Sequence, residues 1–111
     1  LVYISKDANF EVPFMPTKFD LRQNYPNPFN PVTNIVFDLP YTKEKFKVRV
    51  EIFNILGQKI KTLVNTHLEA GRQTLQWKGL NDRGRRVASG MYFYSVQAGS
   101  FFKTKKMVLI K

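Results

Sequence analysis

Apolar and polar residues alternate with a period of two along most of the chain after residue 32. In residues 46–53, for example, four apolar side chains occupy every second position and charged side chains fill the gaps between them. Successive side chains of a β-strand point to opposite faces, whereas a helix would need apolar residues at i, i+3, i+4 and i+7. The pattern therefore predicts strands at residues 19–22, 33–39, 46–53, 58–64, 73–78, 91–98 and 101–110.

Turn-forming residues separate these predicted strands, with glycines at Gly57, Gly71, Gly90 and Gly99 close to the strand ends. Short strands joined by tight turns are typical of sandwiches and small barrels. We predict an all-β fold, a seven-stranded antiparallel immunoglobulin-like sandwich, with a small barrel as the alternative. Each predicted strand has one apolar face, and the core anchors that we expect are Trp77 and Phe46.

A proline-rich segment comes before the first long strand. Each proline fixes its own φ and disfavours helical geometry in the residue before it, so we expect a rigid loop that cannot join a central strand. Asparagine side chains in such a loop can bond to nearby backbone amides. We expect one of its two aromatic residues to pack against the sandwich edge and to fix where the preceding linker leaves. The segment consists of Asn24, Tyr25, Pro26, Asn27, Pro28, Phe29, Asn30 and Pro31.

Residues 1–18 contain two prolines and scattered apolar residues without a sustained period. We interpret them as a linker or the end of a preceding domain, and residues 19–111 as one folded domain. The chain begins at Leu1 without a methionine, so we expect a fragment or a processed product. No apolar run reaches the roughly 18 to 20 residues that span a bilayer, and the first residues lack the pattern of a signal peptide.

The net charge of +10 is concentrated in residues 39–111, which carry +11, while residues 1–38 carry −1. A domain this basic attracts phosphates or anionic glycolipids. Interleaved lysines and aromatics are also compatible with single-stranded nucleic acid. We favour the simpler interpretation that lysines on edge strands prevent edge-to-edge association, which disfavours a nucleic-acid partner.

The sequence offers few groups for catalysis or metal binding. It has no cysteine, and its one histidine, His67, falls in a stretch that we interpret as a turn. Asn81 and Asp82 could offer oxygens to calcium, but a calcium site needs six or more oxygens and three arginines lie beside them. We interpret both side chains as turn caps. The carboxylates are spread singly, so we predict a protein that is not an enzyme and has no cofactor or metal.

Several short motifs follow one another between residues 20 and 111. The proline-rich segment leads directly into residues 32–35, and the later motifs are residues 50–58, 70–71, Trp77, Gly79, and residues 81–84, 87–94, 98–99 and 105–109. In this order they resemble the type A C-terminal sorting domain of proteins exported by the type IX (Por) secretion system. The pattern is also similar to the Ig-like domain of the flagellar hook-capping protein. Beside the proline-rich segment, the structural positions of the resemblance are Gly57, Trp77 and Gly90.

The resemblance implies a domain at the C-terminus of a larger cargo protein. Such a domain takes the cargo from the periplasm through the outer membrane to the cell surface or the medium. The implied partners are the type IX secretion machinery, a sortase-like peptidase that cuts the domain off, and an anionic lipopolysaccharide. In the family the terminal strand is the part most associated with recognition, which here corresponds to Lys105, Lys106, Met107, Val108, Leu109, Ile110 and Lys111.

An alternative function is an accessory carbohydrate- or surface-binding Ig-like module of a secreted hydrolase. Such a module would hold polysaccharide through exposed, coplanar aromatic side chains on one sheet face. Burial of Trp77, Tyr92 and Tyr94 would count against this alternative.

Overall fold

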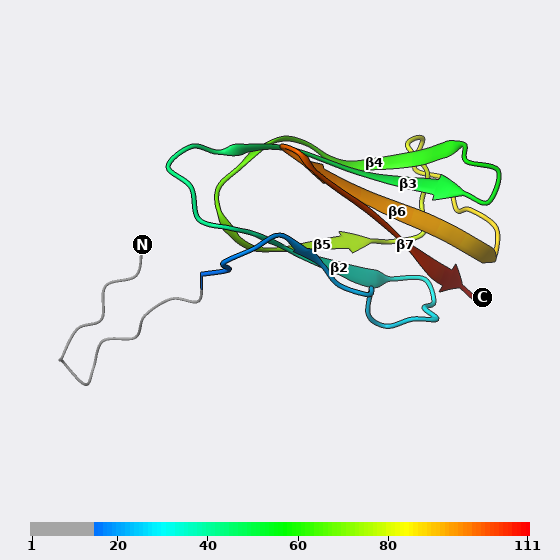
Figure 1. Cartoon of the computed structure of the whole chain (residues 1–111). Coiled ribbons are helices and arrows are strands. Elements are labelled where there is room, and N and C mark those ends of the chain that lie inside the picture. The colour runs from blue at the N-terminus through cyan, green and yellow to red at the C-terminus, as the bar shows by residue number, and fades with distance from the viewer. Residues whose placement is uncertain (1–14) are drawn as a thin grey trace.

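The computed structural model describes residues 15–111, which form two β-sheets packed face to face (Figure 1). One sheet has three strands in the order β1-β2-β5, and the other has four in the order β4-β3-β6-β7, with every pair antiparallel. This arrangement confirms the predicted all-β sandwich of seven strands. The strands are β1 (Asp20–Leu21), β2 (Thr33–Leu39), β3 (Phe46–Asn54), β4 (Lys59–Leu68), β5 (Gly71–Trp77), β6 (Gly90–Ala98) and β7 (Phe101–Leu109).

The strand bounds agree with the alternation pattern to within two residues except in β4, which continues to Leu68 instead of ending near residue 64. Its last residues are mainly polar, but they still pair with β3, where Phe46 lies opposite Leu68. His67 is therefore an exposed strand residue and not part of a turn. Backbone pairing extends an edge strand beyond the residues that contribute to the core, so the apolar pattern ended too early.

Two irregularities in β4 change which of its side chains face the core. The register with β3 shifts between Val50 and Glu51 and again between Ile52 and Phe53. An extra residue in one strand reverses the alternation beyond it. Strict alternation would separate Leu63 from Ile60 and Val64, but all three pack against the core.

The core lies between the two sheets and is built from the inward positions that the alternation predicts. Trp77 is fully buried, as expected. Phe46 is only half-buried and packs at the margin of the core, with Phe19 5.2 Å from it between ring centroids. The fully buried apolar side chains include Ile35, Phe37, Leu39, Val48, Val50, Ile52, Tyr94, Val96, Ala98, Met107 and Leu109.

The sandwich has two distinct ends. At the linker end, Met15 lies by residues 41–45 and 69–70, which belong to the connections from β2 to β3 and from β4 to β5. At the C-terminal end, the proline-rich segment pairs with the last residues of β7, and the turn between β3 and β4 lies at the same end of the sandwich (Figure 1). The proline-rich segment therefore does not mark where the linker leaves, because it lies a strand length away, about 25 Å.

Candidate functional site

The residues of the proline-rich segment, here called the proline loop (residues 24–31), fold back on one another through side-chain hydrogen bonds. Asn24 is buried, and its Nδ2 donates to Thr33 Oγ1 at 2.9 Å and to the Pro26 carbonyl oxygen at 3.2 Å. Thr33 Oγ1 donates to the same carbonyl at 2.8 Å. Tyr25 and Asn34 exchange backbone hydrogen bonds of 3.0 and 2.9 Å. The loop is thus fixed at its start by an asparagine, as its composition predicts.

Phe29 is the aromatic residue that anchors the loop. Its side chain is 1% exposed, whereas Tyr25 is 79% exposed. The Phe29 ring lies 5.7 Å from the ring of Trp77, which in turn lies 5.4 Å from that of Tyr92. Trp77 Nε1 donates to the Leu80 carbonyl oxygen at 2.8 Å, so the buried indole has a polar partner. The loop is therefore bound to the core through a chain of three aromatic rings.

A glycine allows the loop to come this close to the strand ends. Gly79 has a φ of +71°, and a Cβ on it would lie 3.2 Å from the Pro31 carbonyl oxygen. A side chain at this position would be disfavoured by both the backbone conformation and the contact. Gly79 thus keeps the segment after β5 against the end of the proline loop.

The proline loop also covers part of the free edge of β7, which is the outermost strand of its sheet. Phe29 N donates to the Val108 carbonyl oxygen at 3.0 Å, and Ile110 N donates to the Phe29 carbonyl oxygen at 2.9 Å. Val108 N donates to Asn27 Oδ1 at 3.0 Å, and Gln23 Nε2 donates to the carbonyl oxygen of Lys106 at 2.7 Å. The last part of the terminal strand is therefore closed to further strand pairing, because its outward backbone groups already have partners.

Tyr94 connects the start of the loop to the centre of β6. Its hydroxyl donates to the Arg22 carbonyl oxygen at 2.7 Å and accepts from Asn24 N at 2.8 Å. Burial raises the pKa of Tyr94 to about 12, although the bond from Asn24 N lowers it. The phenol therefore keeps its proton at neutral pH and can make both bonds.

The seven residues expected to take part in recognition do not share one environment. Met107 and Leu109 are 0% and 1% exposed and belong to the core. Lys105 and Val108 are partly buried, and the exposed side chains are those of Lys106, Ile110 and Lys111. The difference follows from the alternation of side chains in β7, which places Met107 and Leu109 on the inner face of the strand.

The other two structural positions of the resemblance lie at strand ends. Gly57 has a φ of +79° in the turn between β3 and β4, as expected of a glycine there. Asn54 closes that turn, since its Oδ1 accepts from Leu56 N and Gln58 N at 3.0 Å each. Gly90 is the first residue of β6 and lies opposite Leu109.

One group of exposed side chains was not predicted as a group, since only Ile110 of its four members is among the residues expected to take part in recognition. Ile55, Leu56, Met91 and Ile110 are large and apolar, and all four lie at the C-terminal end of the sandwich. The alternation pattern could have indicated two of these residues, because Met91 and Ile110 fall at positions that face away from the core. Only the folded chain shows that they lie at the same end of the sandwich as the β3–β4 turn.

The residues considered for other ligands have structural roles. Asn81 Oδ1 accepts from Arg83 N and Arg85 N, so it caps its turn as expected. Asp82 Oδ1 accepts from Thr62 N. Among residues 15–111, no three histidine or acidic side chains lie close enough together to hold a metal ion. This described part of the chain also contains no helix that could cross a membrane.

Among residues 15–111, the tyrosines and the tryptophan do not form an exposed platform for a polysaccharide. Trp77, Tyr92 and Tyr94 are 1%, 6% and 0% exposed. The exposed Tyr25 and Tyr41 lie at opposite ends of the sandwich. These positions count against the carbohydrate-binding alternative.

The basic residues of the described part of the chain lie at both ends of the sandwich and along its strands. Lys43 and Lys45 lie at the linker end, whereas the arginine-rich loop before β6 lies at the C-terminal end (Figure 1). Arg49 has partners of its own on the sheet surface, Gln97 Oε1 at 2.6 Å and Glu51 Oε1 at 3.5 Å. The charge is thus spread over the surface.

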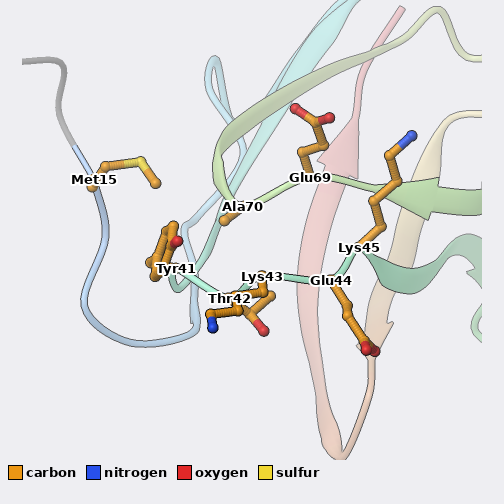
Figure 2. A pocket seen from close by; sticks show the side chains of 8 residues that line it. All are labelled: Met15, Tyr41, Thr42, Lys43, Glu44, Lys45, Glu69 and Ala70. Carbon is orange, nitrogen blue, oxygen red and sulfur yellow. The ribbon is translucent and has the colours of Figure 1, made fainter. Parts of the chain in front are cut away.

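A shallow cleft of about 240 Å³ lies at the linker end. Figure 2 shows lysine and glutamate side chains extending in different directions from its walls, without a set of groups that converge on one point. Charges of both signs and the lack of convergence are features of a solvated surface cleft. Its lining residues are Met15, Tyr41, Thr42, Lys43, Glu44, Lys45, Glu69 and Ala70.

Comparison with known proteins gives a family and several structures of the same fold. Residues 23–111 match the family described as "Secretion system C-terminal sorting domain". Dimeric latent PorU from Porphyromonas gingivalis aligns with a TM-score of 0.66 at 19% identity, covering 87% of this chain and 10% of that one. PorZ, a surface component of the type-IX secretion system of the same organism, aligns with a TM-score of 0.53 at 24% identity, covering 80% of this chain and 11% of that one.

The fold also occurs outside secretion proteins. The Pseudomonas fluorescens alkylpurine DNA glycosylase AlkC, bound to DNA with an abasic site analog, aligns with a TM-score of 0.53 at 16% identity, covering 84% of this chain and 30% of that one. This chain therefore corresponds to a small part of each of these three proteins. No curated protein matches the sequence.

Proposed function

We propose a mode of recognition for this domain, from the premise that the chain belongs to the family of secretion system C-terminal sorting domains. As a type IX sorting domain it directs the secretion of its cargo to the cell surface or the medium, and it is a sorting signal without catalytic activity. The proposal concerns how the secretion machinery reads the folded domain. It also concerns where the domain is removed.

The observation that carries the proposal is the closure of the β7 edge by the proline loop. The carbonyl oxygen of Val108 is hydrogen-bonded to Phe29 N and its N–H to Asn27 Oδ1. A partner would therefore have to displace the loop in order to add a strand at this edge. The side chains of Lys106, Ile110 and Lys111 remain accessible. We therefore assign recognition to the outward side chains among residues 105–111, read on the folded domain.

The positions of the two ends support a separation of recognition from cleavage. We assign residues 1–18 as the linker to the cargo and residues 19–111 as the sorting domain, of type A and similar in fold to the hook-capping protein domain. A sortase-like peptidase would cut the linker at one end while the secretion machinery holds the other. The domain would pass through the periplasm in transit, and anionic lipopolysaccharide is a partner that suits its net charge of +10.

A reporter fusion tests the proposed function. Residues 1–111 would be placed at the C-terminus of a periplasmic reporter in a bacterium with a type IX system, and surface-exposed reporter would be measured by protease accessibility on whole cells. We expect the unaltered fusion at the surface, and the Lys106→Ser/Lys111→Ser variant to accumulate in the periplasm. A matched control, Lys43→Ser/Lys103→Ser, removes the same charge elsewhere and should be delivered normally.

Two results would contradict the proposal. Retention of the unaltered fusion in the periplasm would overturn the sorting role of these 111 residues. Normal delivery of the Lys106→Ser/Lys111→Ser variant would overturn the assignment of recognition to the outward lysines. Deletion of residues 105–111 should also trap the cargo, but it removes Met107 and Leu109 from the core, so the side-chain variants are the sharper test.

A further inference from the structure

The outer face of the four-stranded sheet is apolar over the half nearest the C-terminal end. Ile52, Tyr92 and Met107 are buried on the inner face, so their neighbours along each strand point outward. In the strand register, Phe53 lies opposite Phe93. Met91 lies opposite Val108 on the neighbouring strand pair. Four apolar side chains from three adjacent strands thus lie together on the outer face.

Three further exposed apolar residues lie at the same end of the sandwich as this group. Leu56 and Ile55, at the tip of the β3–β4 turn, are 77% and 66% exposed, and Ile110, beyond the end of β7, is 49% exposed. Met91 is 42% exposed. We call this surface the apolar patch, and its members are Phe53, Ile55, Leu56, Met91, Phe93, Val108 and Ile110.

The apolar patch is confined to one half of the outer face of the four-stranded sheet. Towards the linker end, the outward positions on β3, β6 and β7 are mainly polar, with Arg49, Glu51, Gln97 and Thr104. The outward face of an antiparallel sheet is normally polar, as it is here. No strand among residues 15–111 covers the apolar half, because β4, β3, β6 and β7 form one layer of the sandwich (Figure 1). Contiguous exposed apolar surface of this kind marks an interaction site.

The charges around the apolar patch indicate the chemistry of its partner. Lys106 lies opposite Phe93 and Lys111 follows Ile110, whereas Lys59, opposite Phe53, shares its charge with a neighbouring acid. The neighbouring acid, Glu51, is already paired, with Arg49 at 3.5 Å and Lys59 at 4.0 Å. A cationic rim attracts an anionic surface and repels a second copy of itself. The complementary surface is therefore apolar at its centre and acidic around it.

We propose that the apolar patch is a docking surface for a folded protein that presents apolar side chains surrounded by carboxylates. Phe53, Phe93 and Val108 are half-buried side chains on a sheet face, a shape that matches the core and rim of a protein interface. Insertion into a bilayer would instead require these side chains to project from the surface. The inference rests on the proposed sorting function only in that the protein would be a component of the export machinery.

Paired substitutions test the contribution of the apolar patch. Met91→Ser/Leu56→Ser changes two exposed side chains in the patch, and Phe102→Ser/Tyr41→Ser changes two side chains of similar exposure, 65% and 53%, at the linker end. In the reporter fusion we expect the patch variant to lower the delivery rate about tenfold, a typical loss for central interface residues. The control variant should be delivered like the parent, and equal thermal unfolding midpoints would show that both variants fold.

A photo-crosslinking residue at position 91 identifies what occupies the apolar patch. In cells we expect an adduct with one other protein, and we expect Lys106→Glu to reduce it while Lys103→Glu does not. Delivery of the patch variant at the parental rate would overturn the docking surface and leave the sorting function intact. Adducts confined to a second copy of the fusion, or to lipopolysaccharide, would also overturn it. Failure of the parent fusion to reach the surface would instead contradict the sorting function.

Discussion

The two ends of the sandwich differ in how their aromatic residues are used. At the linker end, Phe19 lies between Phe46 and Phe101, with ring centroids 5.2 and 4.9 Å away, and all three rings remain partly exposed. At the C-terminal end, Phe29 and Trp77 are fully buried beneath the proline loop. The rings at one end are thus stacked on one another but partly exposed to solvent, and the rings at the other end are buried.

This difference suits a domain that is attached at one end and read at the other. An end that joins a linker can tolerate variation, because few of its contacts are fully buried. An end that presents side chains to a partner must hold them in place, and here the hydrogen bonds from Phe29 and Asn27 hold the last part of β7. Substitutions at the two ends should therefore differ in cost.

The largest expected difference is between the two aromatic residues that the alternation suggests as core anchors. Trp77→Ala should lower the free energy of unfolding by about 3–5 kcal/mol, because it leaves a cavity beside Phe29 and Tyr92. Phe46→Ala should cost about 1–2 kcal/mol, because that ring is only half-buried. Urea unfolding followed by far-UV circular dichroism measures both, and equal losses would contradict the comparison.

A smaller effect is expected for Tyr94→Phe, which removes the hydroxyl that joins β6 to the start of the proline loop. The Asn24 N–H and the Arg22 carbonyl oxygen would lose their partner, at a cost of about 1–3 kcal/mol. Chemical denaturation at pH 7 measures this loss. Tyr25→Phe, at an exposed phenol, is the control and should leave stability unchanged.

The same variant has a second readout in alkali. The pKa of Tyr94 rises from 10.0 to about 12 in the folded state because of burial. Below pH 10 the phenol is protonated in both the folded and the unfolded state, so its contribution to the free energy of unfolding is complete. Above pH 10 the phenol ionises first in the unfolded state, which lowers the free energy of that state. The stability of the folded domain therefore falls as the pH rises towards 12. Between pH 10 and pH 12 the Tyr94→Phe variant should therefore lose less stability than the parent, as measured by urea unfolding at a series of pH values. Parallel plots of unfolding free energy against pH for the two proteins would contradict the burial of an un-ionised Tyr94.

The smallest effect is expected for Asn27→Ala in the proline loop. The substitution removes the acceptor of Val108 N and should cost about 1 kcal/mol. Amide hydrogen exchange should become faster at Val108 and stay unchanged in the middle of β3. Asn30→Ala, at another exposed asparagine of the same loop, is the control; equal exchange in the two variants would mean that Asn27 does not hold the strand.

The sequence predicted the strands well where burial and alternation coincide. The β2 bounds agree at both ends, because every second residue from Thr33 to Leu39 is buried. In β4 the prediction of facing was wrong, because two shifts in register interrupt the alternation and no residue type there announces them. The proline loop was expected to be rigid, and the burial of one of its aromatic residues was expected, but the choice of Phe29 over Tyr25 was left open.

The sequence indicated the segment that contains the candidate site, but not which of its side chains are exposed or which residues lie beside them. Residues 105–111 were selected as a unit, yet the core contains Met107 and Leu109, and the outward residues have neighbours such as Met91 from another strand. The hydrogen bond from Val108 N to Asn27 Oδ1 joins residues 81 positions apart. A contact between residues so far apart produces no local sequence pattern, because the two residues become neighbours only in the folded chain.

The sequence by itself determined that this chain forms strands, where most of them begin and end, and which side chains belong inside, because these properties follow from local alternation and from proline and glycine stereochemistry. Tertiary structure alone decided that the proline loop closes the edge of the terminal strand, that residues 15–19 lie at the opposite end, and that Phe53, Phe93, Met91 and Val108 lie together on one outer face. Those features depend on how the strands are ordered in the two sheets, and strand order is set by the packing of the whole domain.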